Sequence, residues 1–204
     1  GAHIRPEDLL STFQTLSVQD AAAFFTAPQA LTKVACPACG GSERGHVFEK
    51  NGFAYARCAD CASVYVPMRP TQEALADYRA RSQAIAFRAA QLTRLTAEAR
   101  RRYVLRSNAL WMGRLVDEAG ATASRAFADL GTNYPALIEE ARGLGLFDTF
   151  YCVDPLPGLE EACGQQGASL ASPAPGSLAA VTAFEQIENQ FSPQAMLRRA
   201  WEWL

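Results

Sequence analysis

Four cysteines are the residues whose type and spacing most clearly suggest a chemistry for this chain. They form two Cys-x-x-Cys pairs within one short segment, Cys36 with Cys39 and Cys58 with Cys61. Each pair can form a tight turn that points two thiolates at one position, and Zn²⁺ takes four such ligands in a tetrahedron. We therefore predict a structural zinc site of the zinc-ribbon type, with disulfides as the alternative. His46, between the pairs, could replace a ligand but is better explained as a surface loop residue.

A site with four cysteine ligands has no open position for a substrate, so we expect it to hold the fold together rather than to catalyse. Between the pairs, Asn51-Gly52 separates two apolar runs, which is a strong signal for a β-hairpin. Residues 31–70 are therefore predicted to form a zinc-ribbon module whose core is too small to be stable without the metal.

A second group of candidate residues lies at the ends of two apolar runs. Asp129 and Gly131 follow the first run, Asp154 follows the second, and residues 135–145 between them have the apolar spacing of a helix. Strand, turn, helix and strand in this order form the first half of a nucleotide-binding α/β unit. A carboxylate at the position of Asp154 can accept hydrogen bonds from both ribose hydroxyls of an adenosine group. The alternative is that it caps the next helix.

The turn after the first run keeps one glycine where nucleotide-binding turns usually have several. Gly131 is followed by Thr132 and Asn133, and Asn is the non-glycine residue that best tolerates a left-handed backbone. Pro135 can begin the helix, although it removes one N–H from the first turn. The turn is altered, but it can still be built.

Composition limits the classes of partner. The chain has 204 residues with a formal net charge of -2, which gives no bias toward nucleic acid or acidic membranes. The basic stretch 94–106 could bind phosphate, but it is better explained as a solvated helix face. No run is long enough to span a membrane, no signal peptide opens the chain, and the cysteine pairs suit a reducing compartment, so we predict a cytoplasmic protein. Cys152 and Cys163 are predicted to be small buried core residues.

The predicted organisation is N-terminal helices over 1–30, the zinc ribbon over 31–70, a helical linker over 71–120 and an α/β domain over 121–204. Within the first segment, Ser17 to Asp20 resembles the capping box of a second short helix. Leu110, Trp111, Leu115 and Val116 are expected to pack the linker on the sheet. Further expected elements are a helix over 157–165, strands over 168–171 and 178–184, and a helix over 193–201.

With these motifs in place, the chain from Cys36 to its end resembles bacterial class I S-adenosylmethionine-dependent methyltransferases that carry an N-terminal zinc ribbon. The two Cys-x-x-Cys pairs, Tyr65 and Pro67 match the ribbon pattern of that family, and Asp129 and Gly131 match its glycine-rich turn. Asn133 and Pro135 replace two of its glycines. In the segment 178–193, Val181, Thr182, Glu188 and Pro193 match the family pattern, whereas Ala179 replaces an acid and Asn189 replaces a histidine.

The resemblance implies a Rossmann-like, partly parallel sheet and methyl transfer from S-adenosylmethionine to a small-molecule or sugar-type acceptor. It places the cofactor against Asp129, Gly131, Thr132, Asn133 and Asp154, and the substrate near Glu188 and Asn189. Glu188 is the candidate base if the acceptor needs one. The alternatives are a catalytically inactive methyltransferase-like scaffold and, as the weakest, a zinc-ribbon nucleic-acid binder.

The resemblance also implies four strands in the order 3-2-1-4, with one edge exposed after the last of them. Either the chain is a fragment of a longer domain, which we favour, or a protein partner or a second copy covers that edge. The amphipathic tail, which ends in Trp201-Glu202-Trp203-Leu204, is expected to be buried.

Overall fold

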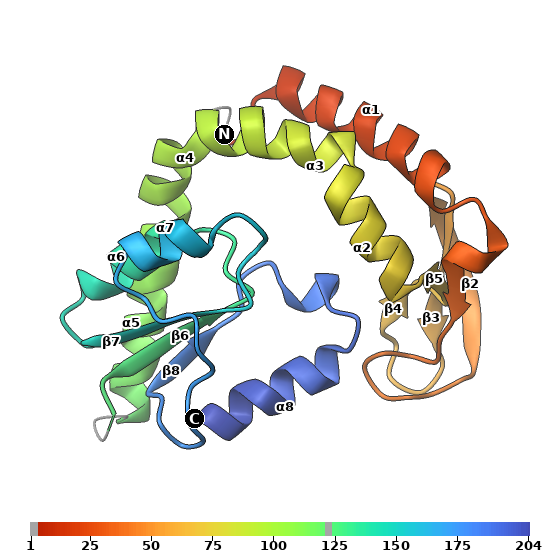
Figure 1. Ribbon diagram of the computed structural model, residues 1–204. Helices are drawn as coiled ribbons and strands as arrows, with labels where there is room; N and C mark the ends of the chain where they lie inside the picture. Colours follow the sequence, from red (N-terminus) through yellow and green to blue (C-terminus); the bar gives the residue numbers. More distant parts are fainter. Residues whose placement is uncertain (1–3, 121–123) are drawn as a thin grey trace. The chain divides into compact units, whose positions relative to one another are not determined.

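The computed structural model describes residues 4–120 and 124–204 (Figure 1). The chain divides into two compact units, residues 1–97 and 98–204. The boundary expected at residue 121 lies outside the described residues. No helix in residues 4–120 and 124–204 is both long and apolar enough to cross a membrane.

The first unit combines helices with two small antiparallel sheets. Its helices are α1 (Glu7–Phe24), the 3₁₀ helix η1 (Pro28–Ala30), α2 (Gln72–Arg81), α3 (Gln83–Phe87), the π-helical segment η2 (Arg88–Thr93) and the start of α4 (Arg94–Arg100). Its strands are β1 (Leu31–Lys33), β2 (Arg44–Lys50), β3 (Phe53–Cys58), β4 (Val64–Tyr65) and β5 (Met68–Pro70). One sheet pairs β1 with β5, and the other has the order β2-β3-β4.

The predicted hairpin is confirmed. β2 pairs with β3 so that Lys50 lies opposite Phe53, and the two turn residues have positive φ, 52° at Asn51 and 79° at Gly52. Two successive left-handed residues make the tight turn that matches the twist of the flanking strands. Phe48 stacks on Tyr55 across the two strands with ring centroids 4.6 Å apart.

The capping box expected at Ser17 to Asp20 is wrong, because α1 runs without a break from Glu7 to Phe24. Ser17 donates to the carbonyl of Phe13 within the helix. Asp20 is buried and accepts from the hydroxyl of Ser82 at 2.5 Å and from the backbone N–H of Ala84 at 2.9 Å. Asp20 therefore supports the first turn of α3 from a different helix, at the point where α2 ends.

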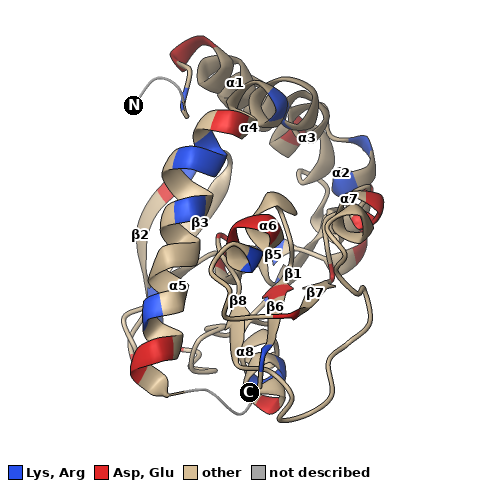
Figure 2. Cartoon of the chain, turned by 90° about the vertical axis from the view of Figure 1, so that its left-hand side faces the viewer, with Lys and Arg blue, Asp and Glu red and all other residues tan. Residues whose placement is uncertain are grey.

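The second unit begins in the long helix, which continues through the π-helical segment η3 (Arg101–Leu105) into α5 (Arg106–Ala119). Gly120 ends it in a left-handed conformation, with φ 61°. Acidic residues lie among the basic ones along α4 and α5 (Figure 2). Arg101 pairs with Glu139 and Glu140, so part of the basic stretch is used in ion pairs of this unit.

The prediction of which residues of this helix pack on the sheet is mostly wrong. Only Val116 is buried, whereas Leu110, Trp111 and Leu115 are about half exposed. The buried positions follow the spacing i, i+4, i+7, i+11 from Leu105, and this spacing defines one face of a helix. They are Leu105, Ala109, Met112 and Val116, with Gly113 buried beside Met112.

The sheet of the second unit is small, parallel and ordered β7-β6-β8. Its strands are β6 (Ala126–Leu130), β7 (Thr149–Val153) and β8 (Ala180–Thr182), and its other elements are α6 (Ala136–Arg142), α7 (Glu160–Gln165), the 3₁₀ helix η4 (Ile187–Asn189) and α8 (Pro193–Trp203). The strand expected over 168–171 is reduced to a single parallel bridge between Tyr151 and Ser169, and the strand expected over 178–184 to its centre. α7 begins three residues later than expected because the turn after Pro157 precedes it.

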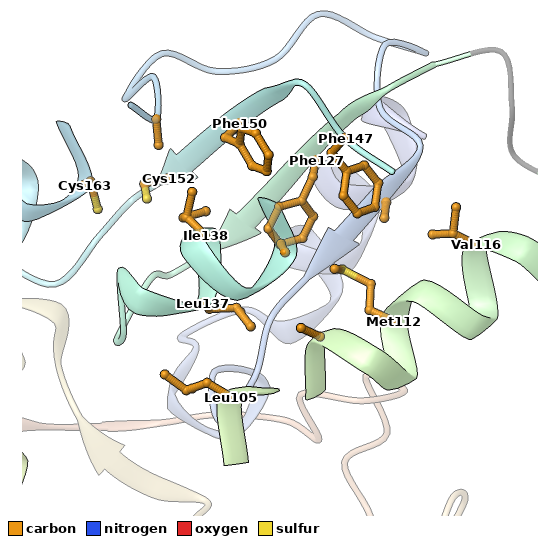
Figure 3. Packing of buried hydrophobic residues seen from close by; sticks show 14 residues of the cluster. Leu105, Met112, Val116, Phe127, Leu137, Ile138, Phe147, Phe150, Cys152 and Cys163 are labelled. Carbon is orange, nitrogen blue, oxygen red and sulfur yellow. The ribbon is translucent and has the colours of Figure 1, made fainter. Parts of the chain in front are cut away.

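Helices cover both faces of this sheet. On one face, residues of α5 and α6 pack against Phe127, Phe147 and Phe150 (Figure 3). On the other, Met196 and Trp203 of α8 pack against the alternate strand residues, Ala128, Leu130 and Val153 among them. The alternation of buried side chains along β6 gives a strand that is buried on both sides, as expected for a parallel strand. The fold is thus a mixed α/β arrangement around a three-stranded parallel sheet.

Replacing Asp20 by alanine should destabilise the first unit by about 3 kcal/mol, because a buried hydroxyl and a backbone N–H both lose a charged acceptor. Urea unfolding followed by helical circular dichroism, with metal in excess, measures this. Gln19→Ala, at the exposed neighbouring position, is the control and should change the free energy of unfolding by less than about 0.5 kcal/mol. Equal effects of the two substitutions would contradict the capping role.

Candidate functional site

The four predicted metal ligands come together. Their Sγ atoms all lie within 4.8 Å of one another. Cys36 approaches Cys61 at 3.6 Å and Cys39 approaches Cys58 at 3.5 Å, both longer than a disulfide bond. The structure thus holds four free thiols that can bind one metal ion. His46 lies on an exposed part of β2 and is not in the cluster.

Two similar turns position these thiols. In the first, the N–H of Gly40 donates to the carbonyl of Cys36, and in the second the N–H of Ala62 donates to the carbonyl of Cys58. Both donors have a left-handed backbone, with φ of 82° at Gly40 and 61° at Ala62. A Cβ at Gly41 would lie 2.0 Å from a carboxylate oxygen of the exposed Asp60 and 3.2 Å from the Sγ of Cys58, so glycine lets the first turn pack closely on the second. Each turn therefore places its two thiols side by side.

The protonation of the cluster also favours a cation. Hydrogen bonding to Ser63 lowers the pKa of the Cys61 thiol to about 6. The N–H of Gly41 lowers the pKa of Cys39, but the neighbouring thiols outweigh it and raise that pKa to about 12. Four thiols this close cannot all ionise without a positive charge between them.

The second candidate site is the carboxyl edge of the parallel sheet. β6 lies in the middle, and the chain leaves it first toward β7 and later returns to β8 on the other side. The loops after the strands therefore diverge, and open α/β sheets bind ligands at this switch point. A left-handed residue follows each strand: Gly131 with φ 75°, Asp154 with φ 47° and Glu185 with φ 56°. Such conformations are rare for non-glycine residues and cluster at functional sites.

Asp129 and Thr132 lie beneath this edge with their side chains used inside the protein. The Asp129 carboxylate is buried and accepts from the hydroxyl of Thr182 at 2.6 Å, which ties β6 to β8. Burial raises the pKa of Asp129 to about 6, although the bond from Thr182 acts in the opposite direction. The Thr132 hydroxyl is fully buried and donates to the backbone carbonyl of Asp129.

The loops after β6 and β7 are joined directly. The N–H of Gly131 donates to the carbonyl of Val153 at 2.7 Å, and the N–H of Leu156 donates to the carbonyl of Thr132 at 3.1 Å. Asn133 follows these two bonded residues in the turn and is partly exposed. These bonds place the turn at Gly131 and Thr132 beside the loop that contains Asp154.

Two residues that the sequence analysis did not identify contact these loops. Gln186 is buried against Gly131, where a Cβ would lie 2.8 Å from its side-chain amide. Arg199 of α8 forms an ion pair with Asp154. Gln186 follows β8 in a segment without periodicity, and Arg199 lies on an amphipathic helix, so neither stands out in the sequence.

The predicted substrate residues lie in η4. Glu188 and Asn189 are exposed, and the Asn189 side chain donates to the carbonyl of Glu185 at 2.8 Å. Across residues 4–120 and 124–204, no hydrogen bond or ion pair joins Glu188 or Asn189 to the loops after β6 and β7. Asn189 thus shapes the backbone after β8 rather than the neighbouring loops.

The two remaining cysteines are core residues, as predicted. Cys152 of β7 and Cys163 of α7 are fully buried and lie near each other in Figure 3. Burial raises the pKa of both thiols, so both are neutral at ordinary pH.

We expect the purified chain to bind one divalent metal ion, measured by elemental analysis. Cys58→Ser should abolish binding and expose residues 31–70 to hydrogen exchange, because the closed site supplies folding energy to this small module. Cys152→Ser, at a buried cysteine outside the cluster, should keep the metal. Full protection of residues 31–70 after metal removal would contradict the structural role.

The buried Asp129 should make stability depend on pH. Its folded pKa of about 6 is above the ordinary value of 3.8, so the folded state binds the proton more tightly and this group favours folding as the pH falls. Relative to Asp129→Asn, the wild-type chain should gain about 1 kcal/mol between pH 7 and pH 5. Urea unfolding of both proteins at the two pH values tests this, and a parallel response would show that the carboxyl group keeps an ordinary pKa.

Comparison with known proteins found no relative of this chain. No protein-family model, no curated protein and no solved structure matches the chain. The proposal for its function therefore rests on the geometry of the two candidate sites.

Proposed function

We propose that the second unit is a Rossmann-like domain that binds S-adenosylmethionine at the carboxyl edge of its sheet. The proposed activity is methyl transfer to a small-molecule or sugar-type acceptor. The observation that carries the proposal is the hydrogen bond from Gly131 to the carbonyl of Val153, the residue before Asp154, at the switch point of the parallel sheet. We further propose that the four cysteines of residues 31–70 bind zinc, which prefers tetrahedral thiolate sites.

The residues at this edge can take the roles that the proposal requires. The side chain of Asp154 is 65% exposed, so its carboxylate is open to the two ribose hydroxyls of an adenosine group. Gly131, which has no side chain, allows close approach of the methionine end of the ligand. Arg199 would release Asp154 when the ribose binds, and the Gln186 side chain would rotate away from Gly131.

The bound cofactor would supply an activated methyl group. The chain's own contribution would then be to hold the acceptor in line with that methyl group and to accept a proton where the acceptor is a weak nucleophile. Glu188 is the candidate base because it is exposed and lies in the 3₁₀ helix after β8. Asn189 holds the backbone of that helix through its bond to Glu185.

A non-catalytic scaffold is the second candidate, and specific contacts favour it. Gln186 occupies the space against Gly131, and the bond between Leu156 and Thr132 joins the two loops between which a ligand would bind. If these contacts are permanent, the edge of the sheet is a closed surface and the unit acts through a protein partner.

Calorimetric titration with S-adenosylmethionine and S-adenosylhomocysteine distinguishes the two candidates. Under the first, both ligands bind, and Asp154→Asn weakens binding at least roughly tenfold because two charge-assisted hydrogen bonds are lost. Asp148→Asn is the matched control, since Asp148 is an exposed acid just before the same strand and pairs with Arg125; it should leave binding unchanged.

Gln186→Ala tests whether the side chain on Gly131 limits access, and the proposal expects tighter binding by this variant. If neither the wild-type chain nor Gln186→Ala gives heat or a thermal shift at millimolar ligand, the edge does not bind the cofactor. That result would favour the scaffold.

A further inference from the structure

Arg100 contacts the turn after β6 with its positive charge. It is the last residue of α4, and its guanidinium carbon lies over the ring of Tyr134, 5.3 Å from the ring centroid. Tyr134 comes directly after the segment Gly131 to Asn133, in the turn at the carboxyl edge of the sheet. A guanidinium over an aromatic ring keeps the N–H donors at the edge of its own plane for other groups. Arg100 therefore brings a cation with free donors to this turn.

The charge of Arg100 is not neutralised by the chain itself. Its neighbour Arg101 pairs with two glutamates of α6, and Arg199, at the loop after β7, pairs with Asp154. Arg100 forms no ion pair within residues 4–120 and 124–204. Its Nε is buried and has no hydrogen-bond partner in that part of the chain. A buried charged donor without an acceptor is costly, which favours an anionic acceptor supplied by a ligand.

The helix that carries Arg100 is held firmly against the helix that follows the turn. The π-helical segment η3 begins at the next residue, and such segments occur frequently at functional sites. In η3, Arg101 donates to the two glutamates of α6 at 2.7 and 2.8 Å. Leu105 of η3 is buried in the same cluster as Leu137 of α6 (Figure 3). These contacts on the C-terminal side of Arg100 fix its position beside the turn.

We propose that Arg100 binds the carboxylate at the amino-acid end of S-adenosylmethionine. The inference rests on the proposed function, under which this end of the cofactor lies at Gly131. Arg100 is partly exposed and only its Nε is buried without a partner, so its terminal N–H groups are accessible. These groups match the two oxygens of a carboxylate, to which they can donate in parallel. Asp154 then recognises the ribose and Arg100 the carboxylate, so groups of opposite charge set the direction in which the cofactor binds.

Calorimetric titration of the full 204-residue chain with S-adenosylmethionine and with decarboxylated S-adenosylmethionine tests the proposal. The two ligands differ only in the carboxylate. The wild-type chain should bind S-adenosylmethionine at least roughly tenfold more tightly, because only this ligand can accept the charge-assisted hydrogen bonds. Arg100→Ala should lose this preference by weakening the binding of S-adenosylmethionine, while its affinity for the decarboxylated ligand stays at the wild-type value.

Arg102→Ala is the matched control. Arg102 is exposed on the same helix and lies over the ring of its neighbour Tyr103, so its loss should leave both affinities unchanged. Three results would overturn the role of Arg100 and leave the proposed function standing: equal wild-type affinities for the two ligands, a preference that persists in Arg100→Ala, or an equal loss of both affinities in that variant. If neither ligand binds the wild-type chain, both the role of Arg100 and the proposed function are wrong.

Discussion

The buried carboxylate of Asp129 is the group on which the carboxyl edge of the sheet depends. Its bond from Thr182 is the side-chain link between the central strand and β8, and its own backbone carbonyl anchors Thr132 in the next turn. Both contacts lie in the interior, where a hydrogen bond to a charged or partly charged group counts for more than at the surface. The loops that could meet a ligand are therefore held from below, by residues that a ligand would not touch.

The two units reach stability by different means. The second unit buries aromatic and aliphatic side chains on both faces of its sheet, so its core is apolar and continuous. The core around the cysteines consists of Cys36, Cys58 and Tyr65, with Val34 packed against them. So few apolar groups cannot offset the conformational entropy of the module, and a metal–thiolate bond network is the physical alternative.

The sequence predicted the features that depend on local chemistry. The cysteine pairs, the Asn51-Gly52 hairpin, the end of the long helix at Gly120 and the strand–turn–helix–strand order all follow from residue type and spacing. Prediction from the sequence failed where contacts between residues far apart in the chain determine the structure. Asp20 resembles a local cap in the sequence, but its carboxylate accepts hydrogen bonds at the start of a different helix, which begins at Gln83. The exposed Trp111 was predicted to pack on the sheet because apolar residues occur on several sides of α5. Gln186 and Arg199 could not be found, since their importance comes only from contacts with Gly131 and Asp154.

The two cysteine turns also differ in a way that would bear on how a bound metal ion leaves the site. Gly40 adopts its left-handed backbone without strain, whereas Ala62 occupies the equivalent place with a methyl group, at a cost of about 1 kcal/mol. If the four thiols bind a metal ion, its coordination would maintain that strained conformation. If that coordination weakens, relaxation of the Ala62 turn would relieve its backbone strain. The Gly40 turn carries no such strain and would gain no stability by relaxing. Release of a bound ion would then be sequential, beginning with Cys61 of the strained turn rather than with Cys39, which is equally exposed, and a state held by Cys36 and Cys39 would precede the metal-free module.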